Sequence, residues 1–310
     1  MKKLLSLALA CTLTLGLASC GGTGTSTSSN APASSSAVES PAAQFDAASY
    51  LSGDYPKLPE DGPAYSLSIG HAMQESTESH KMLLALKDAV EKYSDGKITI
   101  TIYPNSQLGS DSEMIASCVA GDMDMVLQSG STHATFVPET VIFDIPFLFS
   151  GYDIEKIESV LTDSKFRDLY NQANEDGGLV CLMLRAGTDS MNLTSNKPVT
   201  SMEDLKGLKI RTAQVESRMA VWNALGANPT PMAFNELYMA LQNGTVDAQD
   251  NNLSNALSSA LYEVQEYLVP THHMTPSMDL TMNKDKFYSM PQSYQDHHHM
   301  GSYGARIQIA

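Results

Sequence analysis

Strands and helices alternate between residues 65 and 127, and this alternation restricts the possible folds more than any other feature of the chain. Residues 65–69 and 98–102 alternate apolar and polar side chains, the pattern of half-buried strands. Between them, apolar residues recur at helical spacing over 82–93. A strand–helix–strand rhythm of this kind predicts a parallel sheet with helices on both faces.

The following segments continue the rhythm. Ser110 with Glu113 forms a capping box that opens a second helix, and Gly121 is placed to end it before a third strand at 124–127. A new α/β run begins near residue 189. Its expected elements are a short helix opened by Ser201 and Asp204, helices at 216–225 and 235–243, and strands at 208–212, 246–248 and 278–282.

Ligands of open α/β sheets bind beyond the carboxyl ends of the strands. The loops 70–76, 103–111 and 128–133 should therefore line one crevice. They carry mainly neutral hydrogen-bonding groups, with His71 and His133 as the only basic side chains. The polar residues of this wall are His71, Gln74, Asn105, Ser110, Asp111, Gln128 and Ser129.

The start of the chain has the composition of a secretory signal. Two lysines precede an apolar run over 4–17, which is shorter than the roughly 20 residues of a membrane-spanning helix. We expect residues 1–19 to be a signal peptide. The stretch Leu17-Ala18-Ser19-Cys20 resembles a bacterial lipobox, in which Cys20 is lipidated. An ordinary signal peptide with an incidental cysteine is the alternative.

Residues 20–62 are expected to be a lipid-anchored flexible linker, because 21–45 consist almost entirely of Gly, Ser, Thr, Ala, Pro and Asn. About 250 residues remain, enough for two domains. The net charge of −16 makes nucleic acid an improbable partner. An anionic ligand would need a local basic group to overcome this general negative field.

Two cysteines fall in the expected folded part. Cys118 lies in a predicted helix and Cys181 in a predicted strand, so we expect two buried thiols in preference to a disulfide. The chain has no CxxC and no zinc-ligand pattern, and we expect no cofactor and no metal site.

Seven stretches, in order along residues 65–291, resemble the substrate-binding protein of tripartite ATP-independent periplasmic (TRAP) transporters. They are 69–72 (IGHA), 103–111 (YPNSQLGSD), 136–139 (FVPE), 143–149 (FDIPFLF), 204–211 (DLKGLKIR), 224–234 (ALGANPTPMAF) and 262–268 (YEVQEYL).

The resemblance implies a two-domain, periplasmic-binding-protein-like α/β fold of type II-like form, with a ligand cleft between the domains. Domain I would comprise 65–188 and 277–291, and domain II would comprise 189–276. Crossing hinge segments would let the domains close over a ligand, usually a carboxylate.

Arg211 falls on the family's carboxylate-binding arginine, and its guanidinium can donate two parallel hydrogen bonds to a carboxylate. The resemblance implies further ligand contacts, each with an open alternative. Asp111 could instead cap the helix that begins after Ser110, and Phe234 could fill the core. Asn251 matches an amide that contacts the carboxylate, and Ser129 a polar pocket position.

The chain departs from the family's sialic acid binders at their second arginine, where it has Met191. A ligand of that kind is therefore doubtful. Arg185 could enter the pocket instead, or pair with one of the many carboxylates. His71 stays a candidate because it lies in a cleft loop.

The resemblance ends after Pro291, so that 292–310 form a non-matching tail. Family members continue for about sixty residues beyond the position aligned with Asn283 and Lys284. Three explanations could account for the missing C-terminal residues: a frameshift or wrong join near residue 292, a fragment, or a true short variant. His297, His298 and His299 could bind a metal incidentally.

Together these features predict an exported receptor, anchored through Cys20 and facing the periplasm or the cell exterior. It would capture a small carboxylate as a monomer and deliver it to the membrane subunits of a TRAP permease. The alternatives are a lipid-anchored sensor that presents its ligand to a receptor, and an enzyme on the same fold. The sequence contains no GxSxG, P-loop or HExxH motif to support an enzyme.

Overall fold

The structure, a computed structural model, describes residues 58–187 and 189–295, all of which belong to one compact unit. The predicted signal peptide, Cys20, most of the predicted linker and the tail from residue 296 lie outside the described residues. Within the described ranges, no helix combines the length and the apolar character that crossing a membrane requires.

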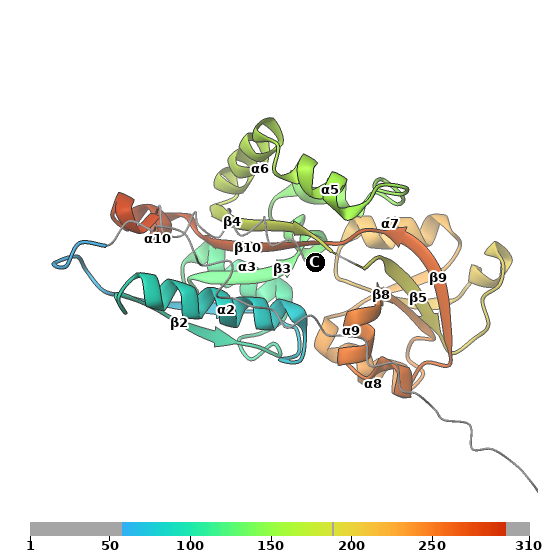
Figure 1. The fold of residues 1–310 in the computed structure, drawn as a ribbon. Helices are drawn as coiled ribbons and strands as arrows, with labels where there is room; N and C mark the ends of the chain where they lie inside the picture. Colours follow the sequence, from blue (N-terminus) through green and yellow to red (C-terminus); the bar gives the residue numbers. More distant parts are fainter. Residues whose placement is uncertain (1–57, 188, 296–310) are drawn as a thin grey trace, which may run out of the picture. The chain divides into compact units, whose positions relative to one another are not determined.

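The first sheet has five strands in the order β2-β1-β3-β10-β4. Its strands are β1 (Tyr65–Gly70), β2 (Ile98–Tyr103), β3 (Met125–Ser129), β4 (Leu179–Ala186) and β10 (Ser277–Asn283). Strands β1, β2 and β3 are parallel, as the sequence predicts. Strand β10 runs antiparallel to both β3 and β4, between which it lies (Figure 1). The sheet is therefore mixed: the parallel pairing predicted from residues 65–127 is confirmed for β1 to β3, and the returning strand β10 adds antiparallel pairing that the sequence did not predict.

Helices cover both faces of this sheet. They are α2 (Glu78–Tyr93), α3 (Asp111–Ala120), α4 (Gly130–His133), α5 (Ile154–Leu161), α6 (Ser164–Asp176) and α10 (Lys284–Ser289), with the 3-10 helix η1 (Pro138–Asp144) after α4. Neighbouring residues of a strand face opposite sides. Leu127 accordingly packs in one core cluster with Leu83 of α2, whereas Val126 packs in another with Met114 of α3.

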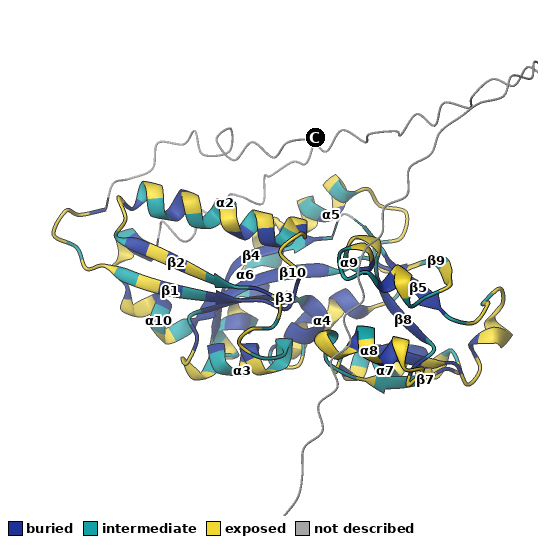
Figure 2. Ribbon diagram, turned by 90° about the horizontal axis from the view of Figure 1, so that it is seen from below, coloured by how far each residue is buried: buried dark blue, intermediate teal, exposed yellow. Residues whose placement is uncertain are grey.

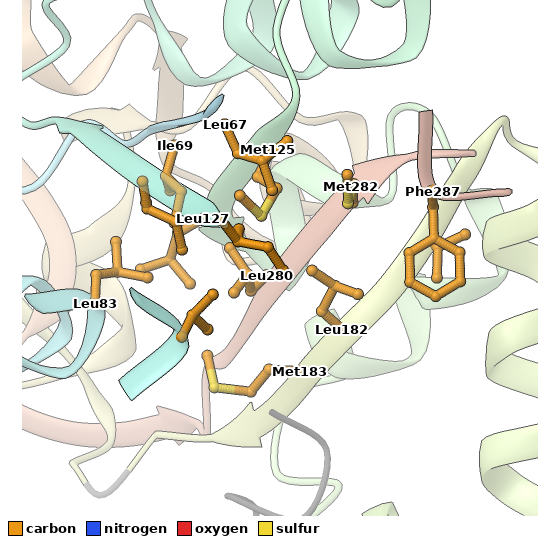
Figure 3. Packing of buried hydrophobic residues seen from close by; sticks show 14 of the residues in the cluster. Leu67, Ile69, Leu83, Met125, Leu127, Leu182, Met183, Leu280, Met282 and Phe287 are labelled. Carbon is orange, nitrogen blue, oxygen red and sulfur yellow. The ribbon is translucent and has the colours of Figure 1, made fainter. Parts of the chain in front are cut away.

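The larger cluster is drawn in Figure 3, where side chains from the sheet and from α2 and α10 meet. Leu67, Leu127 and Leu280 are each about 1% exposed or less. Helix α2 turns buried residues such as Leu83 toward this cluster and shows exposed residues on its outer side (Figure 2). The helix predicted from the spacing of apolar residues over 82–93 is therefore confirmed.

The second sheet has the order β7-β6-β8-β5-β9. Its strands are β5 (Met191–Ser195), β6 (Lys209–Thr212), β7 (Asn228–Pro231), β8 (Ala248–Asn252) and β9 (Tyr267–Met274). Strand β6 is parallel to β7 and β8, and β5 is antiparallel to β8 and β9. The surrounding helices are α7 (Glu216–Ala224), α8 (Leu237–Gln242), α9 (Leu253–Ser258), η2 (Met202–Leu205), η3 (Phe234–Glu236) and η4 (Leu261–Glu263).

Several local predictions are confirmed. Ser110 and Glu113 form the reciprocal capping box of α3, and Gly121 ends that helix in the left-handed region at φ 85°. Cys118 and Cys181 are buried free thiols. The strand expected at 246–248 begins at Ala248 instead and continues to Asn252. The strands divide between the sheets as the proposed domains require, but the domain bounds 65–188 with 277–291, and 189–276, stay a prediction.

Truncating Leu127, which is fully buried, should test the first core. We expect Leu127→Ala to lower the free energy of unfolding by about 2–5 kcal/mol, because it removes buried methyl groups and leaves a cavity. Urea unfolding followed by circular dichroism measures the change. Leu169→Ala is the matched control, since Leu169 is 75% exposed, and it should change stability by less than about 0.5 kcal/mol. Equal effects of the two variants would contradict the assignment of the core.

Candidate functional site

One pocket is lined by residues from both sheets and from the helices and loops beside them. From the first sheet and its helices come Met73, Asp111, Gln128, Ser129, Ser131 and Thr132. From the second come Met191, Arg211, Arg218, Phe234, Asp250 and Asn251. The carboxyl ends of β1, β3 and β6 thus lead to a common site, as expected for open α/β sheets.

Arg211 lies on β6 and is only 5% exposed. Its Nε and Nη2 both donate to the carbonyl oxygen of Met232, at 3.2 and 2.9 Å, and its Cζ lies 5.7 Å from the ring centroid of Phe234. Burial lowers the pKa of Arg211 to about 10, partly offset by the charges of Asp250 and Asp111. The guanidinium is therefore protonated at neutral pH.

No carboxylate of the described residues forms a salt bridge with Arg211. Burying a charge without a paired counter-ion is costly. A ligand carboxylate in the pocket could supply the missing charge and accept charge-assisted hydrogen bonds from the guanidinium. Arg211 has the environment of an anion-binding group.

Arg218, on α7, is the second buried arginine of the pocket, and the sequence analysis missed it. Its Nη1 donates to Asp250 Oδ2 at 2.8 Å, and its Nε lies 3.3 Å from Asp144 Oδ1. Nε and Nη2 also donate to Ser131 Oγ, at 3.1 and 3.0 Å. In contrast to Arg211, Arg218 is fully engaged by protein groups.

A signal for Arg218 was present in the predicted helix 216–225. Arg218 stands four residues before Trp222, the single tryptophan of the chain, and residues at this spacing share a helix face. Trp222 is 2% exposed and packs edge-on against His273 at 5.4 Å between ring centroids. An arginine on the buried face of a helix needs an acidic partner, which the sequence alone does not identify.

Asp250, on β8, connects Arg218 to His273, whose Nε2 lies 3.3 Å from Asp250 Oδ2. Burial by itself would raise the pKa of Asp250. The charges of Arg218, His273 and Arg211 and the hydrogen bond from His273 outweigh this effect and lower the pKa to about 2. Asp250 is therefore ionised at neutral pH.

Asp111 is the first residue of α3, and Ser110 caps that helix. The alternative role of Asp111 as a helix cap is therefore wrong, and its half-buried side chain lines the pocket. Desolvation raises the pKa of Asp111 to about 6, although the charge of Arg211 opposes the shift.

The other sequence candidates divide into two groups. Asn251, Ser129 and Phe234 line the pocket with Arg211 and Asp111. The Oδ1 atom of Asn251 accepts hydrogen bonds from the backbone of Asn252 and from Asn255. Ser129 caps α4, accepting a hydrogen bond from the backbone N–H of Thr132.

The structure does not bring His71 and Arg185 into the pocket lining. His71 is fully buried with its Nε2 3.0 Å from His80 Nδ1, and burial lowers its pKa to about 4. Arg185 Nη1 lies 3.2 Å from Met82 Sδ, and the Arg185 charge acts on Glu158. Met191, at the position of the absent second arginine, does line the pocket.

No cluster of three or more His, Cys, Asp or Glu side chains suited to a metal ion occurs within 58–187 and 189–295. The three consecutive histidines of the tail lie outside the described residues.

Comparison with known proteins identifies the family. Residues 69–300 match the DctP model, described as bacterial extracellular solute-binding protein, family 7. The match continues past Pro291, so the end of the resemblance predicted from the sequence was placed too early. The 2,3-diketo-L-gulonate-binding periplasmic protein of Escherichia coli is 31% identical over 232 residues, which are 75% of this chain and 70% of that protein.

Solved structures agree with this match. A sugar acid binding protein of Advenella mimigardefordensis in complex with galactonate has a TM-score of 0.74 at 28% identity, covering 79% of this chain and 78% of that one. A TRAP solute-binding protein of Roseobacter denitrificans with bound L-galactonate has a TM-score of 0.74 at 27% identity, with coverages of 79% and 80%. The predicted two-domain, periplasmic-binding-protein-like α/β fold is confirmed. The chain belongs to family 7 of the bacterial extracellular solute-binding proteins, the DctP family of TRAP transporter receptors.

Proposed function

We propose that this protein is an exported receptor that captures a small organic acid and delivers it to a TRAP-type membrane permease. The observation that carries the proposal is the buried guanidinium of Arg211, which lines the pocket and forms no salt bridge with a carboxylate of the described residues. In a chain of net charge −16, an arginine so placed is available to pair with an anion from outside the protein.

The pocket offers complementary groups around that arginine. The ligand carboxylate would accept hydrogen bonds from Arg211, and Asn251 would add an amide donor. Phe234, stacked near the guanidinium at 5.7 Å, would cover the apolar side of the ligand. Asp111 and Ser129 would accept hydrogen bonds from ligand hydroxyl groups.

Capture would favour the closed arrangement of the two halves. The pocket takes residues from both sheets, so a bound acid contacts both sides and stabilises the state in which they approach each other. The chain passes from one sheet to the other between β4 and β5 and between β9 and β10. These two crossings are the proposed hinge.

The relatives bind several kinds of acid, including diketogulonate in Escherichia coli and a C4-dicarboxylate in Rhodobacter capsulatus. These ligands share a carboxylate, which is the group proposed to pair with Arg211. The proposed lipid anchor on Cys20 would keep the receptor at the membrane that holds its permease, while the linker lets it move.

Replacing Arg211 tests the carboxylate site directly. We expect Arg211→Met to weaken binding of an organic acid by about 2–5 kcal/mol, the cost of removing one member of a desolvated charge pair. A thermal-shift screen of organic acids identifies the probe, and calorimetry measures its affinity. Arg185→Met is the matched control, because Arg185 lies outside the pocket lining, and it should leave the affinity unchanged. Unchanged binding by Arg211→Met would refute the proposed site.

The pH dependence of stability tests the environment of Asp111. Its pKa is about 6 in the folded protein against an ordinary 3.8, so the folded state holds the proton more tightly than the unfolded state. Ionisation of Asp111 therefore reduces stability as pH rises from about 4 to about 6, and the loss persists above that range.

Asp111→Asn removes this ionisation. We expect the variant to gain stability relative to the wild type above about pH 6, and the gain to shrink toward about pH 4. Thermal unfolding across this pH range measures the difference. Asp122→Asn, which removes an exposed carboxylate, controls for the change in net charge. A pH-independent difference between Asp111→Asn and the wild type would show that Asp111 has no raised pKa.

A further inference from the structure

The charged groups of the pocket are unequally paired. Two arginines and two aspartates line it: Arg211, Arg218, Asp111 and Asp250. Formally the four charges cancel. Of the two arginines, however, Arg218 forms salt bridges, whereas Arg211 has no carboxylate within salt-bridge distance among the residues the structure describes. The free positive charge is confined to one place in the pocket.

Arg218 lies between two carboxylates. Its guanidinium is 2.8 Å from Asp250 and 3.3 Å from Asp144, and all three side chains are at most 6% exposed. Ser131 and Ser217 donate further hydrogen bonds to Asp144. This triad of one cation and two anions has a formal charge of −1, and Asp250 presents it to the pocket.

The remaining charged neighbours do not reverse this sign. His273 Nε2 lies 3.3 Å from Asp250 Oδ2, the same oxygen that accepts from Nη1 of Arg218, and its Nδ1 is engaged by Thr271. Asp111 adds a carboxylate on the wall formed by α3, where its field acts on Arg211. Apart from Arg211 and Arg218, which is already paired with carboxylates, a ligand therefore meets acidic and neutral groups, among them Gln128, Ser129 and Asn255.

Resting on the proposed carboxylate-binding function, we propose that Asp250, by engaging Arg218, makes the pocket selective for hydroxy acids with a single carboxylate and against dicarboxylates. The carboxylate of the acid pairs with Arg211, and its hydroxyl groups bond the acidic and amide side chains. A second carboxylate would face the triad and Asp111. Such a ligand would retain an unpaired negative charge in a desolvated site.

Repulsion of this kind is large enough to decide specificity. Two like charges about 4 Å apart weaken binding by roughly fivefold at the dielectric constant of water and by on the order of a thousandfold at that of a protein surface. Like-charge contacts are also a common way in which proteins reject a wrong partner.

The test compares acids that differ only in the second carboxylate. Galactonate and galactarate form one pair, and erythronate and meso-tartrate form a shorter one; in each pair a terminal alcohol is replaced by a carboxylate. Calorimetry on the wild-type protein should show at least about tenfold tighter binding of the monocarboxylate in the pair that fits.

Asp250→Asn should narrow that ratio by about tenfold or more, because the triad becomes formally neutral and Nη1 of Arg218 becomes available to a second carboxylate. Asp247→Asn is the matched control. Asp247 precedes β8, pairs with Lys197 and does not line the pocket, so its loss should leave the ratio as in the wild type.

Equal or tighter binding of the dicarboxylate by the wild type would overturn the inference, even if Asp250→Asn failed to fold. An unchanged ratio in a folded Asp250→Asn variant, checked by circular dichroism and a cooperative thermal transition, would do the same. Binding of neither kind of acid in this and the wider screen would instead overturn the proposed function itself. The two failures are thus distinguishable.

Discussion

The position of β10 is the constraint on which the rest of the architecture depends. This strand is made from residues 277–283, yet it lies between β3 and β4, near the middle of the first sheet. All strands of the second sheet are inserted between β4 and β10 in the sequence. The first sheet therefore needs a strand from beyond the second half in the sequence, and the contacts of β10 with β3 and β4 join residues far apart in the chain. Contacts of such long range slow folding.

The return of the chain to the first sheet through β10 also positions the ligand site. Because the chain crosses between the sheets twice, residues near β4–β5 and β9–β10, such as Met191 and Pro276, lie beside the pocket. The pocket walls are then built by helix starts and strand ends from both halves. Within these walls, the unpaired Arg211 and the engaged Arg218 have different chemistry although both are buried arginines.

Local sequence patterns predicted features that depend on residues near one another in the chain, but few of the contacts between distant residues. The capping box at Ser110, the spacing of α2 and the burial of both cysteines depend on neighbouring residues, and each is confirmed. The antiparallel course of β10 and the pairing of Arg218 with Asp144 and Asp250 depend on residues far apart in the chain, and were missed. His71 illustrates the same limit: its place in a cleft loop was correctly read, but its burial against His80 depends on the packing of α2.

Trp222 gives the molecule a built-in optical reporter. It is the single tryptophan in the chain, it is buried, and its ring contacts His273, which in turn contacts Asp250 at the pocket. The carbonyl of His273 also accepts a hydrogen bond from the backbone of Phe147, in the segment that follows η1. Any rearrangement of this junction would alter the surroundings of one indole, so its fluorescence can follow the junction without an attached label.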